Sequence, residues 1–119
     1  MDKKFKVIVP VAGEGTRLRP HTNTMPKPLI PVAGKTVLAH VLEPIISLNP
    51  EEILFVVGYM GDVLKKHIEH NYSINSTFVH QDKLLGLGYA VHMALQKKPH
   101  YFITIIFNLH FYITVIRLA

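Results

Sequence analysis

Four short apolar segments alternate with segments of helical periodicity, and this alternation limits the folds that the chain can adopt. The apolar segments cover residues 5–11, 52–57, 77–80 and 101–107. The helical patterns cover residues 36–48, 62–70 and 86–97. Such alternation is typical of a parallel sheet with crossover helices on its faces, and near-continuous apolar strands are those covered on both faces. We therefore expect an α/β fold, a Rossmann-like three-layer sandwich with a mainly parallel sheet, truncated after about the fourth strand.

Three residues are expected to set the ends of the helices. Thr36 precedes the first helical pattern and is a plausible N-cap. Pro44 falls inside the same pattern, so we expect a kink or an early end there. Asp62 is expected to cap the second helix.

The composition excludes several classes of protein. A hydrophobic fraction of 49% is too high for a disordered chain. The absence of cysteine excludes a disulfide scaffold, a thiolate metal site and a cysteine nucleophile. The first residues are charged and hold no apolar signal-peptide core, and we expect a cytoplasmic protein.

The positive charge is concentrated near the N-terminus. Residues 1–35 hold seven of the thirteen Lys and Arg residues against two acidic residues, which accounts for the whole net charge of +5. A local surplus of this kind favours an anionic ligand bound there. Nucleic acid is a weaker interpretation, because no reader motif accompanies the basic residues.

A glycine-rich loop follows the first apolar segment, in the place where α/β sheets usually hold phosphates. It reads Gly13-Glu14-Gly15-Thr16-Arg17. Leu18 stands where a dinucleotide fingerprint needs glycine, and no Walker A sequence follows. What remains is a loop that delivers an arginine, whose planar fork suits bidentate phosphate binding.

Lys27 lies between Pro26 and Pro28, which restrict the backbone around its point charge. Two cations and the loop amides would form a cradle for a polyphosphate, which promotes phosphoryl chemistry by positioning and charge neutralisation. A solvated surface loop is the better interpretation of a lone G-x-G. The longer string from residue 13 to residue 35 favours the functional interpretation.

A second segment, after the third apolar run, holds Gln81 and then Gly86. The Gln81 amide offers both donors and an acceptor, enough to contact the edge of a base. A polar turn with a glycine start is the alternative.

These motifs together resemble those of the sugar-phosphate nucleotidyltransferases, such as glucose-1-phosphate thymidylyltransferases and mannose-1-phosphate guanylyltransferases. The resemblance covers residues 5–98, the N-terminal part of such an enzyme. It implies that an oxygen of a sugar 1-phosphate attacks the α-phosphorus of a nucleoside triphosphate and displaces pyrophosphate, with Mg²⁺.

The resemblance also implies roles for individual residues. The expected catalytic residues are Arg17, at the β- and γ-phosphates, and Lys27, at the α-phosphate and the sugar phosphate. The expected nucleotide-binding residues are Val11, Ala12, Gly13, Glu14, Gly15, Thr16, Gln81 and Gly86.

The resemblance weakens near the C-terminus. Asn108 stands where the family presents an aspartate that holds magnesium, and a neutral amide brings no charge to a cation. We assign residues 1–100 to the nucleotide-binding part and residues 101–119 to a fourth strand with a divergent apolar tail. The tail is expected to come from a broken gene or from a half-domain that a partner chain completes. Little or no turnover is expected in either case.

The tail also leads to expectations about a membrane partner and about self-association. Its uncharged stretch of residues 101–116 is too short to span a bilayer, and its β-branched and aromatic content suits strands. We therefore expect no membrane partner, but self-association through the tail. Two further functions stay open, a nucleotide-binding module without catalysis and a basic nucleic-acid-binding protein. His67 and His70 are interpreted as a solvated helix face and not as metal ligands.

Overall fold

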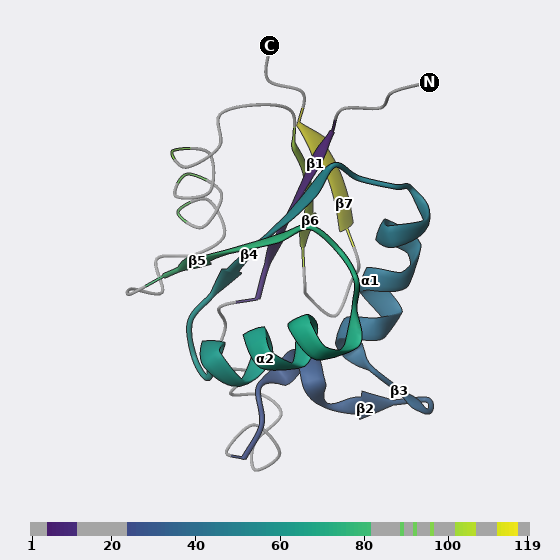
Figure 1. Cartoon of the computed structure of the whole chain (residues 1–119), viewed down its shortest axis with the longest axis vertical. Helices are drawn as coiled ribbons and strands as arrows, with labels where there is room; N and C mark the ends of the chain where they lie inside the picture. Colours follow the sequence, from purple (N-terminus) through teal and green to yellow (C-terminus); the bar gives the residue numbers. More distant parts are fainter. Residues whose placement is uncertain are drawn as a thin grey trace.

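The computed structural model of the chain describes residues 5–11 and 24–81, positions 89, 92 and 96, and residues 102–106 and 112–116 (Figure 1). The elements, in chain order, are β1 (Lys6–Pro10), η3 (Lys27–Leu29), β2 (Pro31–Val32), β3 (Lys35–Thr36), α1 (Val37–Ser47), β4 (Glu52–Val57), α2 (Gly61–Asn71), β5 (Ser76–His80), β6 (Phe102–Ile106) and β7 (Tyr112–Ile116). Positions 89, 92 and 96 are helical, within the third helix expected from the sequence.

Five strands form one sheet in the order β5-β4-β1-β6-β7. The four strands expected from the sequence, β1, β4, β5 and β6, pair in parallel. The expected α/β class and mainly parallel sheet are therefore confirmed. The sheet goes one strand further than expected, because β7 pairs antiparallel with β6 at the edge.

Both faces of the sheet are buried along β1 and β4. Alternate residues of these strands, such as Val7 and Phe55, join residues of α1 and α2 in one hydrophobic cluster. Ile8, Leu54 and Val56 belong to the other alternation and are equally inaccessible to solvent. This double burial explains why these strands are nearly continuous apolar segments in the sequence.

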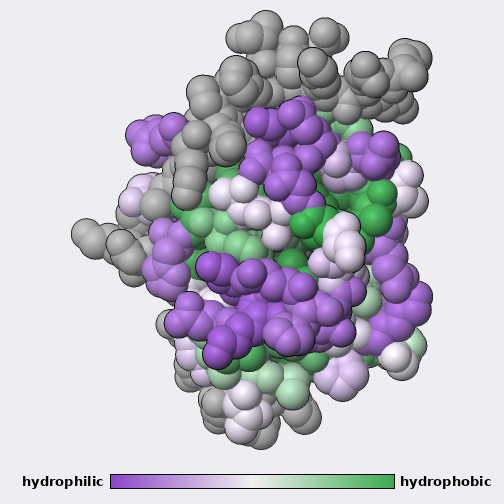
Figure 2. Space-filling model, in the orientation of Figure 1, coloured by the Kyte–Doolittle hydropathy of each residue, from purple (hydrophilic) through white to green (hydrophobic). Residues whose placement is uncertain are grey.

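The two described helices place a polar surface outward. Figure 2 shows a hydrophilic band across the lower part of the molecule, where α2 lies in Figure 1. Leu64 and Ile68 on the inner side of α2 are buried, whereas Asp62, Lys65 and Glu69 are exposed. Within the part of the chain that the structure describes, no helix is long and apolar enough to cross a membrane.

Of the three expectations about helix ends, the cap at Thr36 is confirmed and the cap at Asp62 is wrong. At Pro44 the helix does not end early, and the expected kink stays a prediction. The Thr36 hydroxyl accepts a hydrogen bond from the Ala39 amide at 3.0 Å, which confirms the N-cap of α1. The same helix continues past Pro44 to Ser47, because the buried residues Leu42 and Ile45 hold it against the sheet on both sides of the proline.

The expected cap at Asp62 is wrong. The N-cap of α2 is Met60, in the left-handed region with φ 54° and with no side-chain hydrogen bond. The helix begins at Gly61, so its N-cap lies two residues before the expected one, and Asp62 lies in its first turn. A carboxylate there still interacts favourably with the helix dipole.

Removing the Thr36 cap gives a measurable prediction. Thr36→Ala is expected to lower the free energy of unfolding by about 1 kcal/mol, because the Ala39 amide loses its acceptor. Urea unfolding followed by circular dichroism measures the change. Thr36→Ser keeps the hydroxyl and is the matched control, and an equal loss in both variants would contradict the capping role.

Candidate functional site

Two of the predicted site residues, Val11 and Gln81, lie at the carboxyl ends of the parallel strands. The Val11 amide, just past β1, donates to the Val56 carbonyl at 2.8 Å. The Gln81 amide, just past β5, donates to the Val57 carbonyl at 2.7 Å. The segments that leave β1 and β5 are therefore both hydrogen-bonded to the last two residues of β4, Val56 and Val57.

The strand order makes this edge a topological switch point. From β1 the chain proceeds to β4 and β5 on one side of the sheet, and later to β6 on the other side of β1. In open α/β sheets, ligands bind outside the carboxyl ends of the strands at such a point. Val11, which directly precedes the segment with the glycine and arginine motif in the sequence, lies at this edge.

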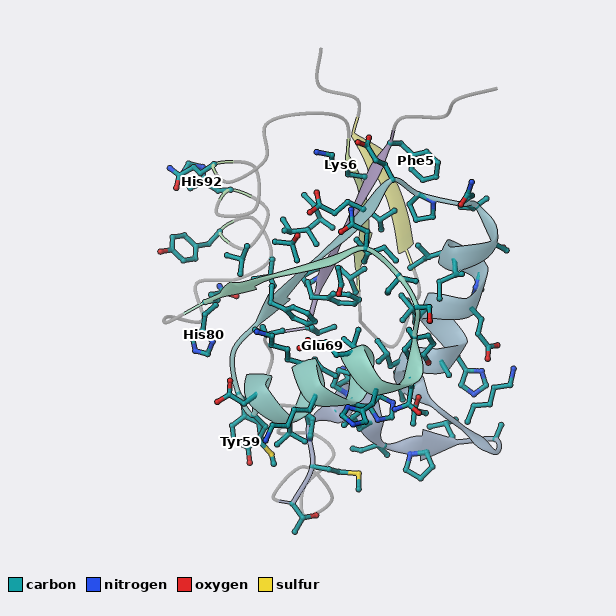
Figure 3. The ribbon with its side chains drawn as sticks, in the orientation of Figure 1. Phe5, Lys6, Tyr59, Glu69, His80 and His92 are labelled. Carbon is teal, nitrogen blue, oxygen red and sulfur yellow. The ribbon has the colours of Figure 1, made fainter. Side chains whose placement is uncertain are left out.

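Gln81 lies in an enclosed position. It is 5% exposed, and it continues the alternation of Thr77 and Val79 on β5. Its neighbour His80 is exposed, and Figure 3 shows His80 at the end of β5. Among the described residues, none hydrogen-bonds the side-chain amide of Gln81, whose donors and acceptor suit recognition of a polar group.

Lys27 begins the short turn η3, which is compact and well supported. Pro26 and Pro28 on either side of it are buried, while Lys27 itself is half-buried. The Leu29 amide donates to the Pro26 carbonyl at 2.9 Å, and the Ile30 amide to the Lys27 carbonyl at 3.1 Å. In Figure 1 this turn lies beside the start of α1, at the end of the molecule where β1 and β4 terminate.

The remaining predicted residues are not placed. Outside the described residues lie Ala12, Gly13, Glu14, Gly15, Thr16, Arg17, Gly86 and Asn108. Their roles stay predictions from the sequence.

The described residues do not form a metal site. Among them, no group of three or more His, Cys, Asp or Glu side chains could hold a metal ion. His67 instead lies beside Asn71, whose side-chain amide donates to the His67 carbonyl at 2.8 Å, in line with a structural role on α2. Asn108 lies outside the described residues, so the expected magnesium ion stays a prediction from the sequence.

Sequence reasoning missed the β2–β3 hairpin, which follows Lys27 directly. Its two strands hold two residues each, and its turn uses Ala33 and Gly34, both with positive φ. The Ala33-Gly34 pair between short segments was the available signal, since two-residue hairpin turns need positive φ.

Comparison with known proteins decides the family. The sequence model described as "Nucleotidyl transferase" matches residues 6–113, most of the chain. The chain belongs to the nucleotidyl transferase family. The matched range contains residues 6–98, over which the sequence motifs resemble this family, and it continues to residue 113.

Individual nucleotidyl transferases support this assignment. The UTP--glucose-1-phosphate uridylyltransferase AglF of Haloferax volcanii is 36% identical over 88 residues, which cover 73% of this chain and 36% of AglF. The bifunctional protein GlmU of Methanococcus maripaludis is 40% identical over 84 residues, which cover 71% of this chain and 20% of GlmU. The chain therefore spans about a third or less of the length of these relatives.

Solved structures share the fold. A UDP-glucose pyrophosphorylase complexed with UDP-glucose superposes with a TM-score of 0.76 at 23% identity, over 87% of this chain and 46% of that protein. The CTP:phosphocholine cytidylyltransferase LicC from Streptococcus pneumoniae gives a TM-score of 0.70 at 27% identity, over 87% and 44% of the two chains. The fold of the described residues is thus that of nucleotidyl transferases.

Proposed function

We propose that the chain is the nucleotide-binding part of a transferase that moves a nucleoside monophosphate from a nucleoside triphosphate to a sugar 1-phosphate. The proposal rests on one observation at the carboxyl ends of the strands. The backbone amides of Val11 and Gln81 both donate to carbonyls of the last two residues of β4. The phosphate-type loop starts at Val11 and the base-reading segment starts at Gln81, so one nucleotide can reach both.

The proposed chemistry is the one that the resemblance to the sugar-phosphate nucleotidyltransferases implies. A phosphate oxygen of the sugar 1-phosphate attacks the α-phosphorus, and the bond from that phosphorus to the bridging oxygen of the leaving pyrophosphate breaks. Arg17 would hold the β- and γ-phosphates and stabilise the charge that develops on pyrophosphate. Lys27 would neutralise charge where the two phosphates approach each other.

The relatives suggest which substrates to test first, although HddC from Yersinia pseudotuberculosis is complexed with GMP-PN. By their names, AglF acts on UTP and glucose 1-phosphate, LicC acts on CTP and phosphocholine, and one pyrophosphorylase is complexed with UDP-glucose. We therefore propose a pyrimidine nucleoside triphosphate as the first ligand to test and a sugar 1-phosphate as the acceptor. A cytoplasmic location belongs to the same proposal.

Nucleotide affinity tests the proposal. Lys27→Ala and Arg17→Ala are each expected to weaken UTP binding about 10- to 100-fold, the range for one lost charge-assisted hydrogen bond. Isothermal titration with UTP, CTP, dTTP and GTP measures the affinities. Lys66→Ala, which removes an exposed cation from α2, is the matched control, and an equal loss in that variant would show nonspecific attraction of the anion.

A second candidate is a nucleotide-binding module without catalysis. It is favoured by Asn108, which replaces the carboxylate that the resemblance predicts. Pyrophosphate release with glucose 1-phosphate and UTP separates the two functions. We expect the 119-residue chain to bind the triphosphate with little or no release, and magnesium-dependent formation of a nucleotide sugar would overturn that expectation.

A further inference from the structure

Two side chains of α1 hold the β2–β3 hairpin from one side. The His40 Nε2 atom lies 2.6 Å from the Val32 carbonyl oxygen, and the Lys35 Nζ atom lies 2.8 Å from Glu43 Oε2. His40 and Glu43 are three residues apart, so they share one face of the helix. We call these two contacts the clasp. Neither contact involves a residue at the carboxyl ends of the sheet strands β1, β4 and β5.

The hairpin that the clasp holds is continuous with the turn of Lys27. The Val37 amide, at the start of α1, donates to the Ile30 carbonyl at 3.0 Å, and the Ile30 amide donates to the Lys27 carbonyl. Pro28 and Pro31 fix φ at two of the four positions between Lys27 and Val32. Little freedom is left in this segment, so a displacement of Val32 must move η3 as well.

The energetics of the clasp indicate positioning and not general stability. Lys35 and Glu43 are each about half exposed, with side-chain exposures of 52%. Exposed ion pairs of this kind contribute little to folding. His40 is exposed too, so the loss of its side chain removes almost no buried apolar surface. The His40 side chain instead fixes the position of the Val32 carbonyl, on strand β2 of the hairpin.

We propose that His40 is a positioning residue for Lys27, acting through the hydrogen bond to the Val32 carbonyl and the short hairpin. The inference rests on the proposed function for the role of Lys27, whereas the mechanical link from His40 to η3 stands on the hydrogen bonds alone. The imidazole donates from Nε2, and a glutamine amide at position 40 can donate to the same carbonyl.

Amide hydrogen exchange tests the mechanical link. His40→Ala is expected to speed exchange of the Leu29 and Ile30 amides about 3- to 10-fold, the range for one lost hydrogen bond. His40→Gln should restore slow exchange. His70→Ala, an exposed histidine on α2, is the matched control. Unchanged exchange at both amides in His40→Ala would overturn the inference.

A double-mutant comparison tests the link to Lys27. His40→Ala is expected to weaken UTP binding about 3- to 10-fold in the wild-type background and to have no further effect in the Lys27→Ala background. Equal losses in the two backgrounds would overturn the positioning role. Wild-type affinity in Lys27→Ala would instead contradict the proposed function, while the exchange data would still decide whether His40 holds η3.

Discussion

Replacing Phe55 by alanine is expected to lower the free energy of unfolding by about 3–5 kcal/mol. Phe55 lies on β4, which has β1 on one side and β5 on the other, and its side chain is inaccessible to solvent. Its ring stacks on Phe78 of β5 with 5.3 Å between the centroids and 18° between the planes. Small domains have total stabilities of about 5–15 kcal/mol, so this one change removes a large share of the stability.

Urea unfolding measures the effect as a lower midpoint at an unchanged slope. Phe55→Leu should lose less than Phe55→Ala because most of the volume is kept. Val63→Ala, on the solvent side of α2 with 44% exposure, is the control and should stay within about 0.5 kcal/mol of wild type. A similar small loss in Phe55→Ala would contradict the central position of β4.

The strands around Phe55 were predictable because burial on both faces leaves a simple sequence pattern. Residues 52–57 are apolar after the first position, and the structure buries all six. Glu52 is the exception, since a glutamate at the start of such a segment suggests the solvent boundary. It is nevertheless 5% exposed. Its partner Lys6 lies 46 positions earlier in the chain, and no local spacing connects the two residues.

At the helix ends, residue-type preferences predict some positions, and packing against the sheet determines others. Thr36 caps α1 as its residue type predicts. Pro44 does not end that helix, because the buried side of the helix continues beyond it. At α2 the expected Asp62 cap gives way to a start at Gly61. A Cβ atom at that glycine would lie 3.1 Å from Cγ2 of Val57, so the close approach to β4 favours glycine at the first position of the helix.

A contiguous motif can be found in the sequence, whereas a contact between separate segments cannot. The Pro26-Lys27-Pro28 string drew attention to Lys27, but the turn η3 that begins at Lys27 was not predicted. His40 gave no signal, since one histidine on a helix has many possible neighbours. Its partner is a backbone carbonyl, which every residue type carries. Only the folded hairpin brings the two together.

A buried polar cluster lies at the amino ends of β1 and β4, at the end of the sheet opposite to the candidate site. Lys6 Nζ lies 3.6 Å from Glu52 Oε1, and the Thr77 hydroxyl donates to Glu52 Oε2. The side chains of Lys6 and Glu52 are 14% and 6% exposed. Figure 3 shows Lys6 at the end of the sheet away from Tyr59, which follows β4 at the carboxyl edge. The cluster is therefore remote from the candidate site.

Lys6→Met is expected to lower the free energy of unfolding by about 3 kcal/mol, because it removes the cation that lies 3.6 Å from the buried Glu52 carboxylate. That figure is the low end of the range for a broken buried pair, since Lys6 keeps some contact with water. The double variant Lys6→Met/Glu52→Leu is expected to recover most of the loss, because it removes both charges and fills the volume with apolar groups. Urea unfolding of the two single variants and the double variant gives the coupling energy.

The coupling energy between Lys6 and Glu52 shows whether this buried charged pair stabilises the fold. Glu52 on β4 contacts Lys6 on β1 and Thr77 on β5, so one carboxylate connects three adjacent strands. A double variant that is as stable as wild type would mean that the cluster adds no net stability, and that its contribution is to fix the register of β1, β4 and β5. Losses that simply add would instead mean that Lys6 and Glu52 act independently, and the pairing read from the 3.6 Å distance would be wrong.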